Sequence, residues 1–175
     1  LIEMIVTQVV RRFGRVGGME SYVWFLCKHL LKARVHLNLI CEDVIDEMPD
    51  LSSSNVWTVD KPLKTRPRWK AMRHFQFCVE HLIRNTPREQ WGIIHSHERL
   101  NLHDVTTIHG PLMGNPDSLG FFRNLNRRIQ EWSVMERDEV SGSNVRAVFC
   151  VSDLAREKLK REYPDAPISS QIMWP

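Results

Sequence analysis

Two neighbouring glycines form the part of this sequence best suited to binding a ligand. Gly17 and Gly18 follow an apolar run at residues 4–10 and precede an amphipathic helical pattern. The first N–H groups of a helix have no partner within the helix, and glycine lets a phosphate or a sugar approach the backbone closely. We therefore expect a ligand-facing turn here. The spacing matches neither a P-loop nor a G-x-G-x-x-G fingerprint, so a turn that only permits close packing is the alternative.

Imidazole side chains follow two further apolar segments. His97 lies just after residues 92–95, and His109 directly after residues 105–108. Imidazole can hydrogen-bond a sugar hydroxyl or a phosphate oxygen, and its pKa lies near neutrality. We expect both residues to contact a ligand, and His95 to be a core residue. His95 and His97 have the spacing of metal ligands, but no third ligand is fixed by spacing and no cysteine is near, so we expect no metal ion.

Alternating apolar and helical segments must position these residues, and they predict parallel βαβ units. The expected strands are 4–10, 35–41, 55–59, 92–95, 105–108, 145–151 and 168–172; the expected helices are 19–32, 69–84, 118–140 and 152–163, the last with Ser152 as N-cap. We expect an α/β, Rossmann-like parallel sheet with helices on both faces. In such a sheet ligands bind at the carboxyl ends of the strands, so the loops at 17–18, 95–98, 109–110 and 152–153 are expected to face one crevice.

Composition and charge exclude several classes of protein. The chain has 175 residues and contains no apolar run near the roughly 20 residues that a membrane span requires. Its four cysteines are widely spread, which predicts buried thiols in a cytoplasmic protein. A net charge of +3 is too small for a dedicated nucleic-acid binder, so we expect no nucleic acid as partner.

Basic residues are nevertheless concentrated in two segments. One holds Arg11, Arg12 and Arg15; the other, residues 61–75, holds six lysines and arginines together with Trp69 and Phe75. Solvated surface charge is the simplest interpretation. The alternative is a patch for anionic lipid head groups or a phosphorylated acceptor, which would allow peripheral contact with a membrane.

Four motifs, in this order along the chain, resemble those of the family-4 retaining glycosyltransferases of GT-B fold. They are residues 13–20 (FGRVGGME), 91–98 (WGIIHSHE), 104–111 (DVTTIHGP) and 149–159 (FCVSDLAREKL). The resemblance covers nearly the whole chain. It implies that residues 1–172 form the N-terminal, acceptor-side domain and that residues 173–175 begin the interdomain linker.

The resemblance also implies a function and a set of site residues. Such enzymes transfer a sugar from a nucleotide-sugar donor to an acceptor hydroxyl with retention of anomeric configuration, without a metal or another cofactor. The acceptor would be a glycan or a lipid-linked sugar, as in cell-envelope polysaccharide synthesis. His109 matches the histidine that reaches the donor sugar and is the expected catalytic residue. The expected substrate-binding residues are Gly17, Gly18, His97, Glu98 and Ser152.

The resemblance has one gap and leaves two alternatives. The family's donor-binding C-terminal domain has no counterpart in these residues, so we expect this chain alone to be inactive. One alternative is a non-catalytic sugar- or protein-binding Rossmann-like module. The other is a fragment of an NAD-type oxidoreductase, with Glu42 as the acidic residue after the second strand. For Glu98, a simple ion pair with Arg99 is the alternative to ligand binding.

Overall fold

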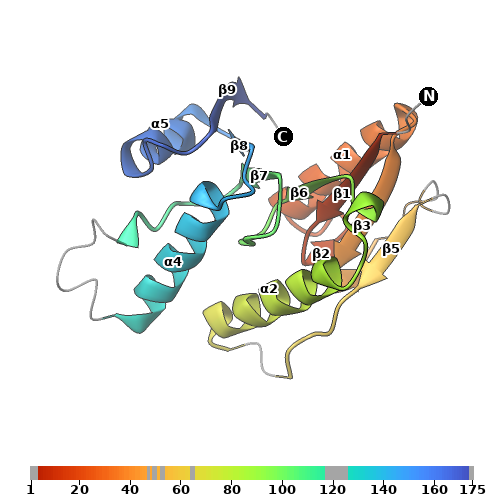
Figure 1. Ribbon diagram of the computed structural model, residues 1–175, viewed down its shortest axis with the longest axis horizontal. Helices are drawn as coiled ribbons and strands as arrows, with labels where there is room; N and C mark the ends of the chain where they lie inside the picture. The colour runs from red at the N-terminus through yellow and green to blue at the C-terminus, as the bar shows by residue number, and fades with distance from the viewer. Residues whose placement is uncertain are drawn as a thin grey trace.

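The central feature of the fold is a parallel sheet of seven strands, seen in Figure 1. The computed structural model describes residues 4–46, 48, 51, 54–63, 66–116 and 126–173. The strands follow the order β5-β3-β1-β6-β7-β8-β9 across the sheet. Their bounds are β1 Ile5–Val9, β3 His36–Cys41, β5 Asn55–Thr58, β6 Ile93–Ser96, β7 Val105–Ile108, β8 Ala147–Cys150 and β9 Ile168–Ile172.

The strand order reverses direction at the centre of the sheet. From β1 the chain first moves outwards through β3 to β5, and then returns to pair β6 with the other side of β1. Val9, the last residue of β1, is in register with Ile40 on one side and Ser96 on the other. The loops that leave β1 and β6 therefore diverge, and a crevice opens between them at the carboxyl ends of the strands.

Helices cover both faces of the sheet, as the sequence predicts. The helices are α1 Gly18–Lys32, α2 Arg68–Arg84, α4 Arg127–Ser141 and α5 Asp153–Glu162, with a short 3-10 helix, η2, at Arg88–Gln90. Leu39 packs in one hydrophobic cluster with Val23 and Cys27 of α1, whereas its neighbour Ile40 packs in another with Phe75 of α2. Because consecutive strand residues point to opposite faces, α1 and α2 lie on opposite sides of the sheet.

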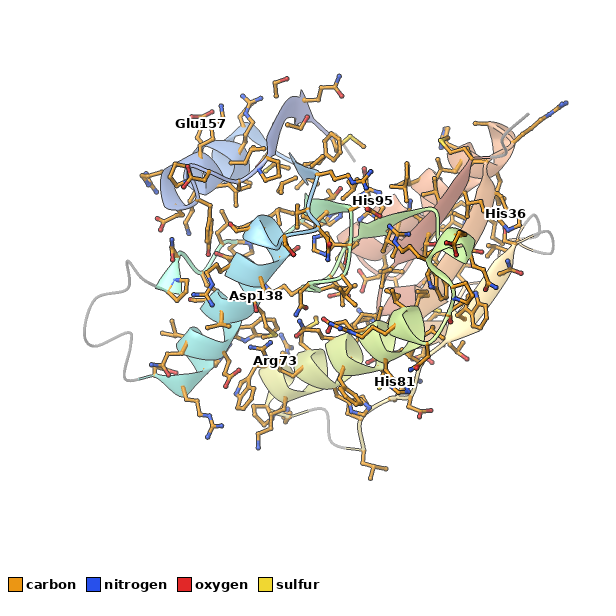
Figure 2. All side chains as sticks on the ribbon, viewed as in Figure 1. His36, Arg73, His81, His95, Asp138 and Glu157 are labelled. Carbon is orange, nitrogen blue, oxygen red and sulfur yellow. The ribbon has the colours of Figure 1, made fainter. Side chains whose placement is uncertain are left out.

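The far half of the sheet is covered by α4 and α5. Leu159 of α5 packs against Val148 and Cys150 of β8, and Met135 of α4 belongs to the same cluster as α2. Helices α2 and α4 lie side by side in Figure 1, and Arg73 bridges them through an ion pair of 3.3 Å with Glu131. Figure 2 shows Arg73 between the two helices and His95 near the middle of the sheet.

Most expected elements are present within one or two residues of their predicted bounds. The predicted N-cap is confirmed, because the Ser152 hydroxyl accepts a hydrogen bond from the Ala155 N–H at 3.2 Å. The helix expected at 118–140 is described only from Arg127, where the Asn126 side chain caps it, and residues 117–125 lie outside the described residues. The sequence missed a short parallel pair, β2 Arg12–Phe13 with β4 Asp43–Val44, because two-residue strands carry no periodic signal.

The four cysteines are free thiols. Cys27, Cys41 and Cys150 are buried, as expected, while Cys78 on α2 is only partly buried. None of the described helices is long and apolar enough to cross a membrane.

Candidate functional site

Two adjoining cavities open at the crevice where β1 and β6 end. We call the first the histidine cavity; its volume is about 470 Å³ and its lining includes His97, Glu98, Arg99, His109, Gly110, Trp132 and Glu139. The second is the arginine cavity, of about 580 Å³, lined by Arg11, Arg12, Met19, Glu20, Arg66, Arg68, Ala71 and Glu98. Met19, Arg68 and Glu98 line both, so the two cavities share a wall. Volumes of this size suit a sugar or a sugar phosphate.

A network of hydrogen bonds, which we call the histidine network, lies behind the histidine cavity. His109 Nε2 lies 2.9 Å from His97 Nδ1, and His97 Nε2 lies 2.7 Å from Gln8 Oε1. At the other end of the network, Gln8 Nε2 lies 3.4 Å from His95 Nδ1, and His95 Nε2 lies 2.8 Å from the Thr107 hydroxyl. The network joins β1, β6 and β7 on the α1 side of the sheet.

The amide of Gln8 determines which ring nitrogen of each histidine carries the proton. An amide oxygen can only accept, so His97 must donate from Nε2, and its Nδ1 is then an acceptor in the neutral ring. His109 must therefore donate from its own Nε2 to His97. The Nδ1 atom of His109 is left as an acceptor, and it has no hydrogen-bond partner among the residues that the structure describes.

Burial keeps these imidazoles neutral at physiological pH. It lowers the pKa of His109 to about 4 and that of His95 to about 3, and it holds the pKa of His97 well below its usual range. Tyr22 of α1 packs its ring edge-on against both His97 and His109, with ring centroids 5.8 and 5.0 Å apart. His109 is thus held in one orientation as a neutral hydrogen-bond acceptor.

Two carboxyl groups of the histidine cavity also have pKa values that favour the neutral form. Burial raises the pKa of Glu98 and of Glu139 to about 7. Glu98 accepts a hydrogen bond from the Arg11 N–H at 3.2 Å, and Glu139 accepts one from the Thr106 hydroxyl at 2.9 Å. Buried carboxyl groups with shifted pKa values in a cleft are typical of functional sites.

Arg99 pairs with carboxylates other than the one suggested by the sequence. Its guanidinium lies 3.0 Å from Glu136 and 3.7 Å from Glu139. Glu136 is fully buried and also accepts hydrogen bonds from the N–H groups of Met113 and Gly114. The alternative of a Glu98–Arg99 pair is therefore wrong, and Arg99 instead joins the loop after β6 to α4.

The structure brings some predicted site residues together at the crevice and leaves one apart. His97, Glu98 and His109 line the histidine cavity, with both nitrogens of His97 already occupied by protein partners. Gly17 caps the start of α1 and Gly18 opens it, directly before Met19, and a Cβ at Gly18 would meet nothing within 4 Å. Ser152 lies at the same edge of the sheet, but it lines neither cavity.

The site also depends on residues that the sequence patterns do not single out. Gln8 lies within an apolar stretch of the sequence, and Tyr22 lies on the apolar face of its helix. A signal existed for Gln8, because a polar side chain in the middle of a central strand must find a buried partner. Nothing in the sequence indicates that Glu139 lies in the site, since a glutamate on a helix is usually exposed to solvent.

No group of three or more His, Cys, Asp or Glu side chains could hold a metal ion within the described parts of the chain. Glu42, the residue on which a dinucleotide site would depend, is buried, and its Oε2 accepts from Arg11 at 2.9 and 3.2 Å. The carboxylate is thus bound by the protein itself.

Comparison with known proteins decides the family. The sequence profile named Glycosyltransferase Family 4 matches residues 16–170. The chain belongs to Glycosyltransferase Family 4. No curated protein sequence matches it significantly.

The fold of this family-4 chain is also found in a solved structure. The crystal structure of WaaG, a glycosyltransferase involved in lipopolysaccharide biosynthesis, matches with a TM-score of 0.73 at 13% sequence identity. The match covers 94% of this chain and 44% of that protein, so the chain spans less than half of its length. The seven-stranded sheet thus has the Rossmann-like fold found in this GT-B glycosyltransferase. Family membership removes the support for an oxidoreductase.

Proposed function

We propose that this chain is the acceptor-side domain of a retaining glycosyltransferase. The enzyme would transfer a sugar from a nucleotide-sugar donor to a glycan or lipid-linked acceptor, in cell-envelope polysaccharide synthesis. The acceptor hydroxyl oxygen forms the new bond to the anomeric carbon, and its proton passes to an oxygen of the leaving diphosphate. The bond from that carbon to the diphosphate breaks, and the nucleoside diphosphate leaves with the electron pair.

The observation that carries this proposal is the Nδ1 atom of His109 at the histidine cavity, which has no hydrogen-bond partner among the described residues. A neutral imidazole with an open acceptor, fixed by hydrogen bonds behind it, suits a sugar hydroxyl as its donor. We assign His109 to the transferred sugar, and we assign His97 the role of holding His109 in place. The first turn of α1, which begins at Gly18, offers backbone N–H groups beside the same crevice, where they would stabilise charge on the leaving diphosphate.

Three further parts of the proposal concern the complete enzyme. Residues 1–172 would form one domain, 173–175 would begin a linker, and a C-terminal domain would hold the nucleotide sugar. This chain alone would therefore be inactive, and the reaction would need no metal ion.

The enzyme would be cytoplasmic, with peripheral contact to the membrane through residues 61–75. Leu63 is fully exposed within that segment, and co-sedimentation of the chain with phosphatidylglycerol vesicles tests this contact.

A full-length protein with a single histidine changed tests the assignment. His109→Gln is expected to lower kcat for sugar transfer by about 10²-fold, because the hydroxyl of the donor sugar loses a preorganised partner. His81→Gln is the matched control, since His81 lies on α2, away from His95 in Figure 2. Release of nucleoside diphosphate from a set of nucleotide sugars measures the rate, and the anomeric proton signal of the product reports retention.

Two outcomes would count against the proposal. Equal rates for the His109→Gln and His81→Gln variants would remove His109 from the site. Absence of transfer from every nucleotide sugar, in the presence of cell-envelope extract, would favour the non-catalytic binding module instead.

A further inference from the structure

Four arginines from two distant segments converge on the arginine cavity. Arg11 and Arg12 follow β1, Arg66 lies just before the N-cap of α2, and Arg68 is the first residue of α2. Arg11 is paired with Glu42 at 2.9 Å, and Arg12 with Glu20 at 2.5 Å. Arg66 and Arg68 are exposed and have no carboxylate partner among the described residues. The cavity therefore holds two positive charges that the described carboxylates do not neutralise.

The two helices that border the cavity begin without side-chain caps. Met19 and Glu20 come from the first turn of α1, whose N-cap is Gly17; Arg68 and Ala71 come from the first turn of α2, whose N-cap is Pro67. Neither N-cap forms a side-chain hydrogen bond, and α2 has no acidic residue in its first turn. An arginine at the positive end of a helix is unfavourable by itself. A bound anion would offset both the helix dipole and the guanidinium charge.

Among the described residues that line the cavity, the acidic ones are Glu20 and Glu98, and both do little to oppose an anion. The Glu20 carboxylate is bound to Arg12 and folds back against Gly17. Burial raises the pKa of Glu98 to about 7, so a large share of it is uncharged near neutral pH.

We propose that the arginine cavity binds a phosphate oxyanion carried by the acceptor, with Arg66 and Arg68 as its principal ligands. The inference rests on the proposed function and specifies the acceptor class, a phosphorylated glycan or phospholipid-linked sugar. Because Met19, Arg68 and Glu98 also line the histidine cavity, an acceptor anchored by its phosphate extends directly towards His109. Arginine suits this role because its planar fork of donors matches the geometry of phosphate oxygens.

Binding of glucose 1-phosphate to the 175-residue chain tests the inference without any turnover. At low ionic strength, calorimetry should detect binding, and the amide signals of Arg68 and Ala71, which line the cavity, should shift. The Arg66→Gln/Arg68→Gln variant should bind at least tenfold more weakly. Arg84→Gln/Arg161→Gln is the matched control, because it removes the same charge from two exposed arginines outside the cavity and should bind as the parent does.

The possible outcomes distinguish a glycan phosphate from a lipid phosphate. They also distinguish failure of the phosphate site from failure of the proposed function. Binding of glucose 1-phosphate that the Arg66/Arg68 variant loses supports a glycan phosphate. Binding only to phosphatidylglycerol vesicles, lost in the same variant, supports a lipid phosphate. Equal binding of both probes by the two double variants, or no binding by the parent, overturns the inference. A full-length protein that transfers sugar but fails this test would retain the proposed function and lose only the phosphate site.

Discussion

Gln8 is a polar residue in the middle of the central strand, and each end of its amide is hydrogen-bonded to a different histidine. It is almost completely buried, so both ends need protein partners. The amide oxygen fixes the tautomer of His97, and His97 in turn fixes that of His109. A residue that lines neither cavity thus determines how the site presents a hydrogen-bond acceptor.

At this scale we predict that Gln8→Met changes the proton positions on two distant imidazoles. Methionine has a similar length but offers His97 only a weak acceptor, so both tautomers of His97 and His109 should become populated. The lost hydrogen bond should also destabilise the chain by roughly 1–3 kcal/mol. Long-range ¹H–¹⁵N correlation spectra of the histidine rings report the tautomers. A spectrum unchanged relative to the parent and to the exposed control Gln171→Met would contradict the role of Gln8.

At the scale of elements, Gly92 and Gly18 lie where a strand and a helix begin, but a side chain would meet different surroundings at each position. Gly92, which precedes β6, has φ +57°, and a Cβ there would lie 2.1 Å from the backbone oxygen of Ile5. Gly18, the first residue of α1, would place a Cβ in open space. Close packing therefore explains Gly92 but not Gly18, whose lack of a side chain leaves room for a ligand instead.

We predict opposite effects for alanine at these two positions. Gly92→Ala should lower the free energy of unfolding by roughly 2–4 kcal/mol, because it combines a left-handed backbone with a backbone clash. Gly18→Ala should leave stability unchanged or raise it by about 0.4–1 kcal/mol, because alanine restricts the unfolded chain. Urea unfolding of both variants provides the measurement. Destabilisation of both by similar amounts would show that Gly18 is needed for packing.

For the whole molecule, buried titratable groups link stability to pH in two opposing ways. Burial lowers the pKa of His95 to about 3 and of His103 and His109 to about 4, and that of His97 is also lowered. The unfolded chain therefore takes up protons that the folded chain excludes, and stability falls as pH drops below about 6.5. Glu98 and Glu139, with pKa values of about 7, act in the opposite direction: they reduce stability as pH rises from about 4.5 to 7.

The two effects predict greatest stability near pH 6.5–7, since four histidines outweigh two carboxyl groups on the acid side. Glu98→Gln should raise the free energy of unfolding by roughly 1–3 kcal/mol at pH 8, where the parent must hold a buried charge. At pH 5 the same substitution should have little effect, because Glu98 is then protonated in the folded chain. Urea unfolding of parent and variant at both pH values gives the comparison. An equal gain at both values would show that the charge of Glu98 is not the cause.

The sequence predicted the elements and the fold class well, because both depend on local patterns. Apolar residues recur every three or four positions in α1, and apolar runs bounded by turn residues mark the strands. The same patterns placed Gly18, His97 and His109 at the carboxyl ends of strands, and the order of motifs indicated the family. Helix capping by Ser152 was equally local, since it depends on a residue three positions away.

Only the tertiary structure decided what these residues do at the crevice. It placed Gln8 behind His97, 89 residues away along the chain, and thereby selected the nitrogen that His109 presents. It also brought Arg66 and Arg68 beside Arg11 and Arg12, two basic segments that the sequence showed only separately. Such contacts depend on how parallel strands pair across the sheet, and no pattern within a short window of sequence records that pairing.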